Sequence, residues 1–214
     1  MPIETARGQR ITIHFDARRC VHSRNCVLGN PKVFVPNVEG EWLHPDAASA
    51  AEVEAIVRSC PSGALTFERI DDVADEHAPE VNTVHVRENG PLAFHADCTI
   101  AGQPRQPYRV TLCRCGQSRH KPFCDTRHKE VGFTATGEPA EKPSEALAVR
   151  NGTLSIEPQK DGPLKVVGNL EVVSGTGRTV NRVTETFFCR CGQSANKPYC
   201  DGSHRKVGFQ AEGA

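Results

Sequence analysis

Two short stretches of the chain each place three cysteines and one histidine at the same intervals. Both follow the spacing C-x-C-x8-C-x3-H, which gathers four side chains of the kinds that bind zinc or iron. The first set is Cys113, Cys115, Cys124 and His128, and the second is Cys189, Cys191, Cys200 and His204. Because the whole spacing is repeated, we interpret both sets as metal sites rather than buried structural cysteines.

The spacing alone does not choose the metal. Three cysteines and a histidine can close a tetrahedral zinc site, although zinc sites more often use C-x2-4-C pairs. Four ligands also hold a [2Fe-2S] cluster, and imidazole in place of thiolate raises its reduction potential. Histidine removes one thiolate charge from the cluster, so an added electron meets less repulsion.

Three more cysteines lie nearer the N-terminus. The stretch "CVHSRNC" separates Cys20 from Cys26 by five residues, and a Cys-Pro pair begins at Cys60. Bacterial-type ferredoxins use C-x2-C-x2-C with a remote Cys-Pro, and here Ser23 stands at the middle position. Three thiolates suit a [3Fe-4S] cluster, whereas a [4Fe-4S] cluster needs Ser23, His22, water or another group at its fourth iron. Both alternatives stay open.

Composition excludes several classes of partner. The chain has 26 Lys and Arg residues and 26 Asp and Glu residues, so its formal net charge is zero and gives no indication of a nucleic-acid partner. No apolar run approaches the ~20 residues that span a bilayer, and "MPIETARGQRITIHFD" lacks the apolar core of a signal peptide. We expect a cytoplasmic protein with no membrane or nucleic-acid partner, in which the ten cysteines stay reduced.

The elements around these cysteines predict an α+β fold that begins with a small ferredoxin-like domain at 1–75. The alternation of apolar and polar residues in "ITIHF" predicts a strand. Residues 45–59 are predicted to form a helix capped by Asp46 or Ser49, and "ALTFERI" is predicted to form a returning strand. The acidic stretch "DDVADEHAPE" is expected to be a linker.

A repeat occupies the rest of the chain. "NGPLAF" corresponds to "DGPLKV" and "KEVGF" to "KVGF", with the linker-like "TATGEPAEKPSEA" between the copies. We assign the β-rich domains to 81–135 and 150–214, with strands at "LAFHADCTI", "LKVVGNLEVV" and "RVTETFF" and a turn opening a short helix at "KPFCD" and "KPYCD". Units this small rarely fold on a hydrophobic core alone, so a bound metal is expected to contribute.

The second motif, "CRCGQSANKPYCDGSH", resembles the signature of the CDGSH iron-sulfur domain (NEET-type) family at every fixed position. The first copy keeps the ligands but has Thr126 and Arg127 where the family has Gly and a small residue. This departure bears on its turn geometry and potential, not on its ligation. The resemblance implies a [2Fe-2S] cluster in each copy. Family members dimerise by exchanging strands, so the two copies are expected to pair as an internal pseudo-dimer and leave the chain monomeric.

The N-terminal stretches "RCVHSRNCVLGNPKVF", "EWLHPDA" and "CPSGALTF" resemble the divergent single-cluster ferredoxin domain over roughly residues 10–70. This resemblance implies that Cys20, Cys26 and Cys60 hold one [3Fe-4S] or [4Fe-4S] cluster.

Other residues near the motifs have simpler interpretations. The cations Arg114, Arg190, Lys121 and Lys197 either offset cluster charge, guide an acidic partner, or are solvated surface charges. Asp125 and Asp201 are expected to cap the short helices. Cys98 is expected to be a small buried residue.

Together these features predict a three-cluster electron-transfer protein. The chain has no G-x-G-x-x-G after a strand and no P-loop, so a separate reductase or electron acceptor is the expected partner. The alternatives are a carrier that delivers clusters to apo acceptors, a redox or pH sensor, and a zinc-stabilised interaction module. No nucleophile and base arrangement indicates an enzyme.

Changing Ser23 to Cys supplies the missing thiolate, so the Ser23→Cys variant should hold a stable [4Fe-4S] cluster in the N-terminal domain. Absorption and EPR spectra before and after reduction check this. A variant whose spectra match those of the parent protein would contradict the ligand assignment.

Overall fold

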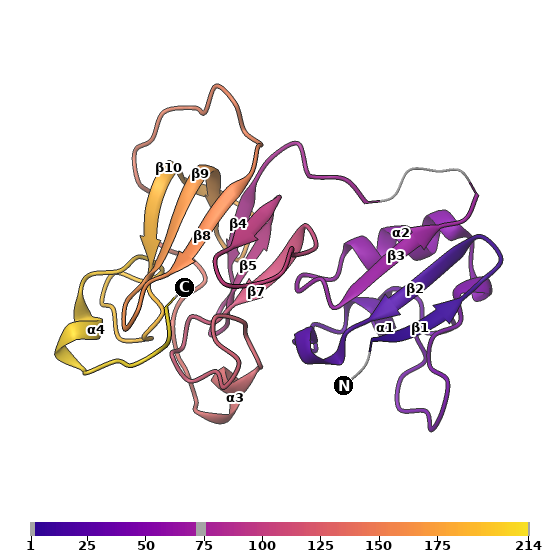
Figure 1. The fold of residues 1–214 in the computed structure, drawn as a ribbon. Coiled ribbons are helices and arrows are strands. Elements are labelled where there is room, and N and C mark those ends of the chain that lie inside the picture. Colours follow the sequence, from indigo (N-terminus) through magenta and orange to yellow (C-terminus); the bar gives the residue numbers. More distant parts are fainter. Residues whose placement is uncertain (1–2, 72–75, 214) are drawn as a thin grey trace. The chain divides into compact units, whose positions relative to one another are not determined.

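The computed structural model describes residues 3–71 and 76–213 and divides the chain into two compact units, Met1–His77 and Ala78–Ala214 (Figure 1). The linker expected at 71–80 falls partly outside the described residues. The two CDGSH-like copies, assigned to 81–135 and 150–214, together make up the second unit. Within the described part of the chain, no helix has the length and apolarity needed to cross a membrane.

A three-stranded antiparallel sheet in the order β1-β2-β3 forms the base of the first unit. Its strands and helices are β1 (Glu4–Arg7), β2 (Ile11–Phe15), η1 (Ala17–Arg19), α1 (Asn25–Gly29), η2 (Pro45–Ala47), α2 (Ala50–Arg58) and β3 (Leu65–Arg69). The predicted strands at "ITIHF" and "ALTFERI" are therefore confirmed. Alternation buries Ile11 and Ile13 against α2, whose Val53 and Val57 are fully buried.

The helix expected at 45–59 is divided into two. Pro45–Ala47 forms a 3-10 turn, and Ala48 is extended before α2 begins. Ser49 is the cap, because its side chain accepts a hydrogen bond from the Glu52 amide at 3.3 Å. Asp46, the other candidate, instead accepts the Gln9 amide at 2.8 Å and ties this turn to the start of β2.

The second unit contains one seven-stranded sheet in the order β6-β8-β9-β4-β5-β7, with β10 also paired to β9. Its elements are β4 (Thr83–Val86), β5 (Leu92–His95), β6 (Cys98–Ile100), β7 (Arg109–Leu112), α3 (Arg127–Glu130), β8 (Leu154–Pro158), β9 (Leu164–Val173), β10 (Thr179–Phe188) and α4 (Ser203–Lys206). The strand expected over "LAFHADCTI" is divided into β5 and β6, whereas β9 covers "LKVVGNLEVV" as predicted.

Strands of both copies contribute to this sheet, and β6 of the first copy lies at one edge beside β8 of the second. Two parallel pairs, β4 with β9 and β6 with β8, join the first copy to the second. The core is shared as well, since Phe94 of β5 packs edge-on against Phe188 of β10 with ring centroids 6.1 Å apart. Figure 1 shows the loops that carry α3 and α4 at the same end of the sheet.

The two ligand loops meet backbone against backbone. Gly116 and Gly192 both have φ of +80°, a left-handed conformation that favours glycine. A Cβ atom on Gly116 would overlap the carbonyl group of Cys191, and one on Gly192 would overlap that of Cys115. In each copy, therefore, a glycine without a side chain lies against the backbone of a cysteine in the other copy, Gly116 against Cys191 and Gly192 against Cys115.

Gly116→Ala should separate the two loops, because the added methyl group has no space. Gly132→Ala is the matched control, since Gly132 also has a positive φ, of +61°, but has nothing within 4 Å of an added Cβ. The control should lose about 1–2 kcal/mol of unfolding free energy, and Gly116→Ala should lose more. Chemical denaturation of both variants measures this difference, and equal losses would contradict the contact.

Candidate metal centres

The first predicted ligand set lies in the loop after β7, which carries its three cysteines, and in α3, which carries His128. Cys113 follows β7 directly, and the amide of Cys124 donates to the Thr111 carbonyl at 3.0 Å, which closes the loop. The side chains are arranged as two pairs. The sulfur atoms of Cys113 and Cys115 are 3.7 Å apart, and Cys124 Sγ is 3.4 Å from His128 Nδ1.

The second set repeats this arrangement after β10. Cys189 and Cys191 have sulfur atoms 3.7 Å apart, and Cys200 Sγ is 3.4 Å from His204 Nδ1. Exposure differs between the copies: Cys124 and His128 are buried, whereas Cys200 and His204 are only partly buried. The structure thus brings the eight residues that the repeated spacing selected together as four pairs, two in each copy.

The donor pairs fit metal coordination. Tetrahedral bonds of about 2.3 Å to sulfur and about 2.0–2.1 Å to nitrogen place two donors on one metal about 3.5–3.8 Å apart. The sulfur pairs at 3.7 Å fall within this range and the Cys–His pairs at 3.4 Å lie just below it, so each copy can hold two metal atoms, one per pair. In residues 3–71 and 76–213, no group of three or more His, Cys, Asp or Glu side chains converges on a single ion position.

Local hydrogen bonds prepare the sulfur atoms for ligation. Cys113 and Cys115 share a hydrogen bond between their sulfur atoms, which lowers the pKa of Cys113 to about 6 and raises the pKa of Cys115. Burial raises the pKa of Cys124 to about 12 while the Thr126 amide, 3.4 Å from its sulfur, opposes that shift. Backbone donors of this kind stabilise a coordinated thiolate and tune the potential of a cluster.

Aspartate and serine residues of the motif shape the loops. Asp125 accepts hydrogen bonds from the amides of Arg119 and Arg127, at 2.8 and 3.2 Å, and Asp201 makes the equivalent bonds in the second copy. Asp125 and Asp201 lie one residue before the N-cap positions, which are held by Thr126 and Gly202, so the aspartates are not the caps themselves; they accept the first helical amide and hold the loop shut with a second bond. Ser118, which is buried, donates to the Phe123 carbonyl at 2.7 Å, as Ser194 does to that of Tyr199.

Thr126 adopts the backbone conformation of the glycine it replaces. Its φ of 69° and ψ of 0° nearly match the 85° and 0° of Gly202. A left-handed conformation is strained for a β-branched residue, yet the surrounding loop bonds keep the same turn. The departure from the family motif therefore leaves the turn geometry unchanged.

The arginines between the paired cysteines are not solvated surface charges. Arg114 and Arg190 are each 1% exposed. Each lies over an aromatic ring of its own copy, Arg114 over Phe133 and Arg190 over Phe209, with the guanidinium carbon 5.5 Å from the ring centroid. Burial lowers the pKa of Arg114 to about 10, which leaves it charged at neutral pH.

The N-terminal cysteines surround one cavity. Cys20, Cys26 and Cys60 line a space of about 290 Å³ together with His22 and Ser23. The sulfur of Cys20 is 3.9 Å from His22 Nδ1, and burial raises the pKa of Cys26. The three predicted ligands and both candidates for a fourth therefore face the same space.

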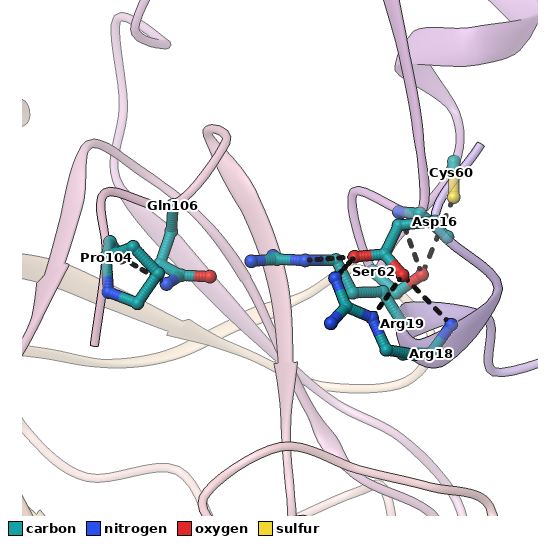
Figure 2. A network of polar contacts seen from close by, with 8 residues as sticks. Asp16, Arg18, Arg19, Cys60, Ser62, Pro104 and Gln106 are labelled. Atoms are coloured by element: carbon teal, nitrogen blue, oxygen red, sulfur yellow. Dashed lines mark hydrogen bonds and ion pairs between the residues drawn. The ribbon is translucent and has the colours of Figure 1, made fainter. Parts of the chain in front are cut away.

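Two polar residues fix the walls of this cavity. Asp16 caps the η1 turn before Cys20, and its hydrogen bonds with Arg18 keep its pKa below the usual value (Figure 2). Asn25 donates to the Ser59 carbonyl at 2.8 Å and so joins the segments that carry Cys26 and Cys60. Sequence reasoning missed Asn25, whose only signal is its position beside a ligand.

The remaining cysteine, Cys98, is buried. Cys98 lies in β6 with 1% exposure, and burial raises its pKa to about 12. All ten cysteines, which fall within the described residues, are free of disulfide bonds. The interpretation of Cys98 as a packing residue is confirmed.

Comparisons with known proteins agree with these sites. A family model described as "Divergent 4Fe-4S mono-cluster" matches residues 6–69, and one described as "Iron-binding zinc finger CDGSH type" matches residues 80–129 and 161–205. The chain is also similar to the uncharacterized protein YjdI of Escherichia coli (strain K12), with 41% identity over 61 residues, covering 28% of this chain and 78% of the relative. YjdI of Escherichia coli O157:H7 matches to the same extent.

Ligand loops and family matches together define an iron-sulfur binding protein. The chain thus carries an N-terminal region that matches the divergent 4Fe-4S mono-cluster model, followed by two regions that match the CDGSH-type model.

Relieving the strain at Thr126 should stabilise the first copy. Thr126→Gly should raise the free energy of unfolding by about 1–2 kcal/mol, because glycine adopts a positive φ without steric cost. The reciprocal change, Gly202→Thr, is the matched control and should lower it by a similar amount. Denaturant titration of both variants provides the measurement, and a stability loss in Thr126→Gly would show that the threonine side chain is needed.

Proposed function

We propose that the protein is an electron-transfer protein with a [2Fe-2S] cluster in each CDGSH copy and a [3Fe-4S] or [4Fe-4S] cluster in the N-terminal domain. The observation that carries this proposal is the division of each CDGSH ligand set into two pairs, with donors 3.4–3.7 Å apart. Two pairs supply two metals, as a dinuclear cluster requires, whereas one zinc ion needs all four donors around a single point.

Residues of this chain would hold, shield and tune the clusters. The paired cysteines and the Cys–His pairs supply the ligands, and bound clusters supply one-electron redox chemistry. Amides of Gln117 and Gln193 lie 3.5 and 3.4 Å from the sulfurs of Cys115 and Cys191, and such donors raise the potential. Burial of the first-copy ligands excludes water and favours retention of that cluster.

The N-terminal cavity supports a third cluster. Three thiols face a space of about 290 Å³, which suits three thiolate ligands. His22 and Ser23 line the same space, so either could reach a fourth iron. The choice between [3Fe-4S] and [4Fe-4S] depends on whether one of them binds.

Electron transfer needs external partners. We propose that the chain exchanges electrons with a separate reductase or redox acceptor and catalyses no reaction of its own. The copies are proposed to act as an internal pseudo-dimer, which the shared sheet and the contact between Gly116 and Cys191 support. The chain would then work as a monomer.

A carrier role is the second candidate, favoured by the difference in exposure between the copies. Cys200 and His204 are partly buried and line an open pocket of about 640 Å³, whereas Cys124 and His128 are buried. A cluster in the second copy would be the easier one to release to an apo acceptor.

Anaerobic purification followed by measurement of iron, acid-labile sulfide and zinc tests the proposal. With EPR before and after dithionite reduction, about seven or eight irons per chain with mixed signals are expected for three clusters. Zinc without sulfide would overturn the assignment. Incubation with an apo acceptor and a chelator separates the two functions, because a carrier transfers its cluster intact whereas an electron-transfer protein retains it through repeated reduction.

A further inference from the structure

Residues 137–144, in the stretch between the two copies, contact both of them. The amide of Gly137 donates to the carboxylate of Glu88 in the first copy, and the carbonyl of Gly137 accepts the amide of Gly175 in the second at 2.8 Å. A Cβ atom on Gly137 would overlap the backbone of Glu88, so the two segments pass each other closely. This part of the predicted linker is therefore packed against the fold.

The same segment continues along the hairpin that joins β9 to β10 and along β10 itself. Three hydrogen bonds hold it there: the Thr176 amide donates to the Glu138 carboxylate at 2.8 Å, the Lys142 amide to the Val180 carbonyl at 2.8 Å, and the Arg182 amide to the Ser144 hydroxyl at 3.1 Å. Each bond uses a backbone amide as its donor. The peptide chain of the second copy therefore fixes the position of the segment.

The side chain of Lys142 lies over the ring of Tyr199. Its Nζ atom is 3.6 Å from the ring centroid, well within the range at which a cation is attracted to the face of an aromatic ring. Tyr199 is buried, its hydroxyl accepts the side-chain amide of Asn181 at 2.9 Å, and its ring stacks on that of Phe188 with centroids 5.8 Å apart. Contacts from three different side chains therefore fix the position of this ring.

Tyr199 and Phe188 lie next to the predicted ligands of the second copy. Tyr199 directly precedes Cys200, and Phe188 directly precedes Cys189. Tyr199 and Phe188 also form a β-bridge, which joins the chain segments that carry the two ligand pairs. A shift of Tyr199 would therefore move Cys200 relative to Cys189.

We propose that residues 137–144 form a clamp that holds the second ligand set in place, and that Lys142 is the positioning residue through which the clamp acts. Loss of the Lys142 ammonium would free Tyr199 to shift, which would separate the two ligand pairs of that set. The clamp itself depends only on contacts within the chain, whereas its effect on a cluster rests on the proposed [2Fe-2S] site. A cluster in the second copy would then be lost more readily, while the first copy is unaffected.

The second copy can be followed alone once the first cannot hold a cluster. Cys124→Ser with His128→Ala removes two predicted ligands of the first copy, so the histidine nitrogen coupling in pulsed EPR then comes from the second. In this background Lys142→Gln removes the ammonium, and Lys142→Arg keeps a cation. Glu141→Gln is the matched control, because it removes an exposed ion pair with Arg178 at 3.4 Å from the same segment without changing the contact with the ring.

Lys142→Gln should lose iron from the second copy to a chelator about tenfold faster than the parent background, because one cation–ring contact is lost. Lys142→Arg and Glu141→Gln should each stay within about twofold of the parent rate. Adding Tyr199→Leu removes the ring, so Lys142→Gln should then have little further effect. The proposal is overturned by an unchanged rate in Lys142→Gln, by an equal acceleration in Lys142→Arg or Glu141→Gln, or by the same effect with and without the ring.

A second measurement needs no cluster signal. Hydrogen exchange of the full-length protein as purified, with both ligand sets intact, reports on the backbone directly. In Lys142→Gln, peptides covering residues 196–204 should exchange faster, whereas those covering 120–128 should exchange as in the parent protein. Unchanged exchange over 196–204 would overturn the clamp. Faster exchange there in a protein that contains neither iron nor sulfide would support the clamp while the proposed function fails, so the two failures are distinguished.

Discussion

Contact between two peptide backbones constrains both CDGSH sites at once. At Gly116 and Gly192 the ligand loops approach so closely that no side chain fits between them. Each of these glycines directly follows a predicted ligand cysteine, so peptide geometry rather than flexible side chains sets the separation of the two predicted ligand sets. The parallel pairs β4–β9 and β6–β8 hold the same arrangement from the sheet.

The strands and the ligand sets could be predicted because their signals are local. Alternation in "ITIHF" and the long apolar run at Leu164–Val173 correspond directly to β2 and β9. The breaks could not be predicted. Ala48 becomes extended because Ser49 caps the next helix, and the predicted strand at residues 92–100 divides where β5 pairs with β7 and β6 with β8. Such breaks depend on partners that are distant in the sequence.

The surroundings of the sites were harder to predict than the ligands. Burial of Arg114 depends on carbonyls at Gly90 and Ala135, which the fold brings together from both sides of the ligand loop. A sequence motif shows the arginine but not those acceptors. At Thr126 the sequence misled in the other direction. A threonine in place of glycine suggested an altered turn, but the hydrogen bonds accepted by Asp125 keep the turn in the same left-handed conformation.

Sharing one sheet between two copies has a consequence for the order of folding. During synthesis, β4 and β6 emerge before β8 and β9, the strands with which they make parallel pairs. The first copy must therefore remain with exposed strand edges until the chain has been made at least as far as Val173. A ribosome-bound nascent chain that ends between the copies would carry the predicted cluster ligands of the first copy without the complete sheet that positions them. Metal insertion into the first copy would therefore have to wait until the second copy has been synthesised.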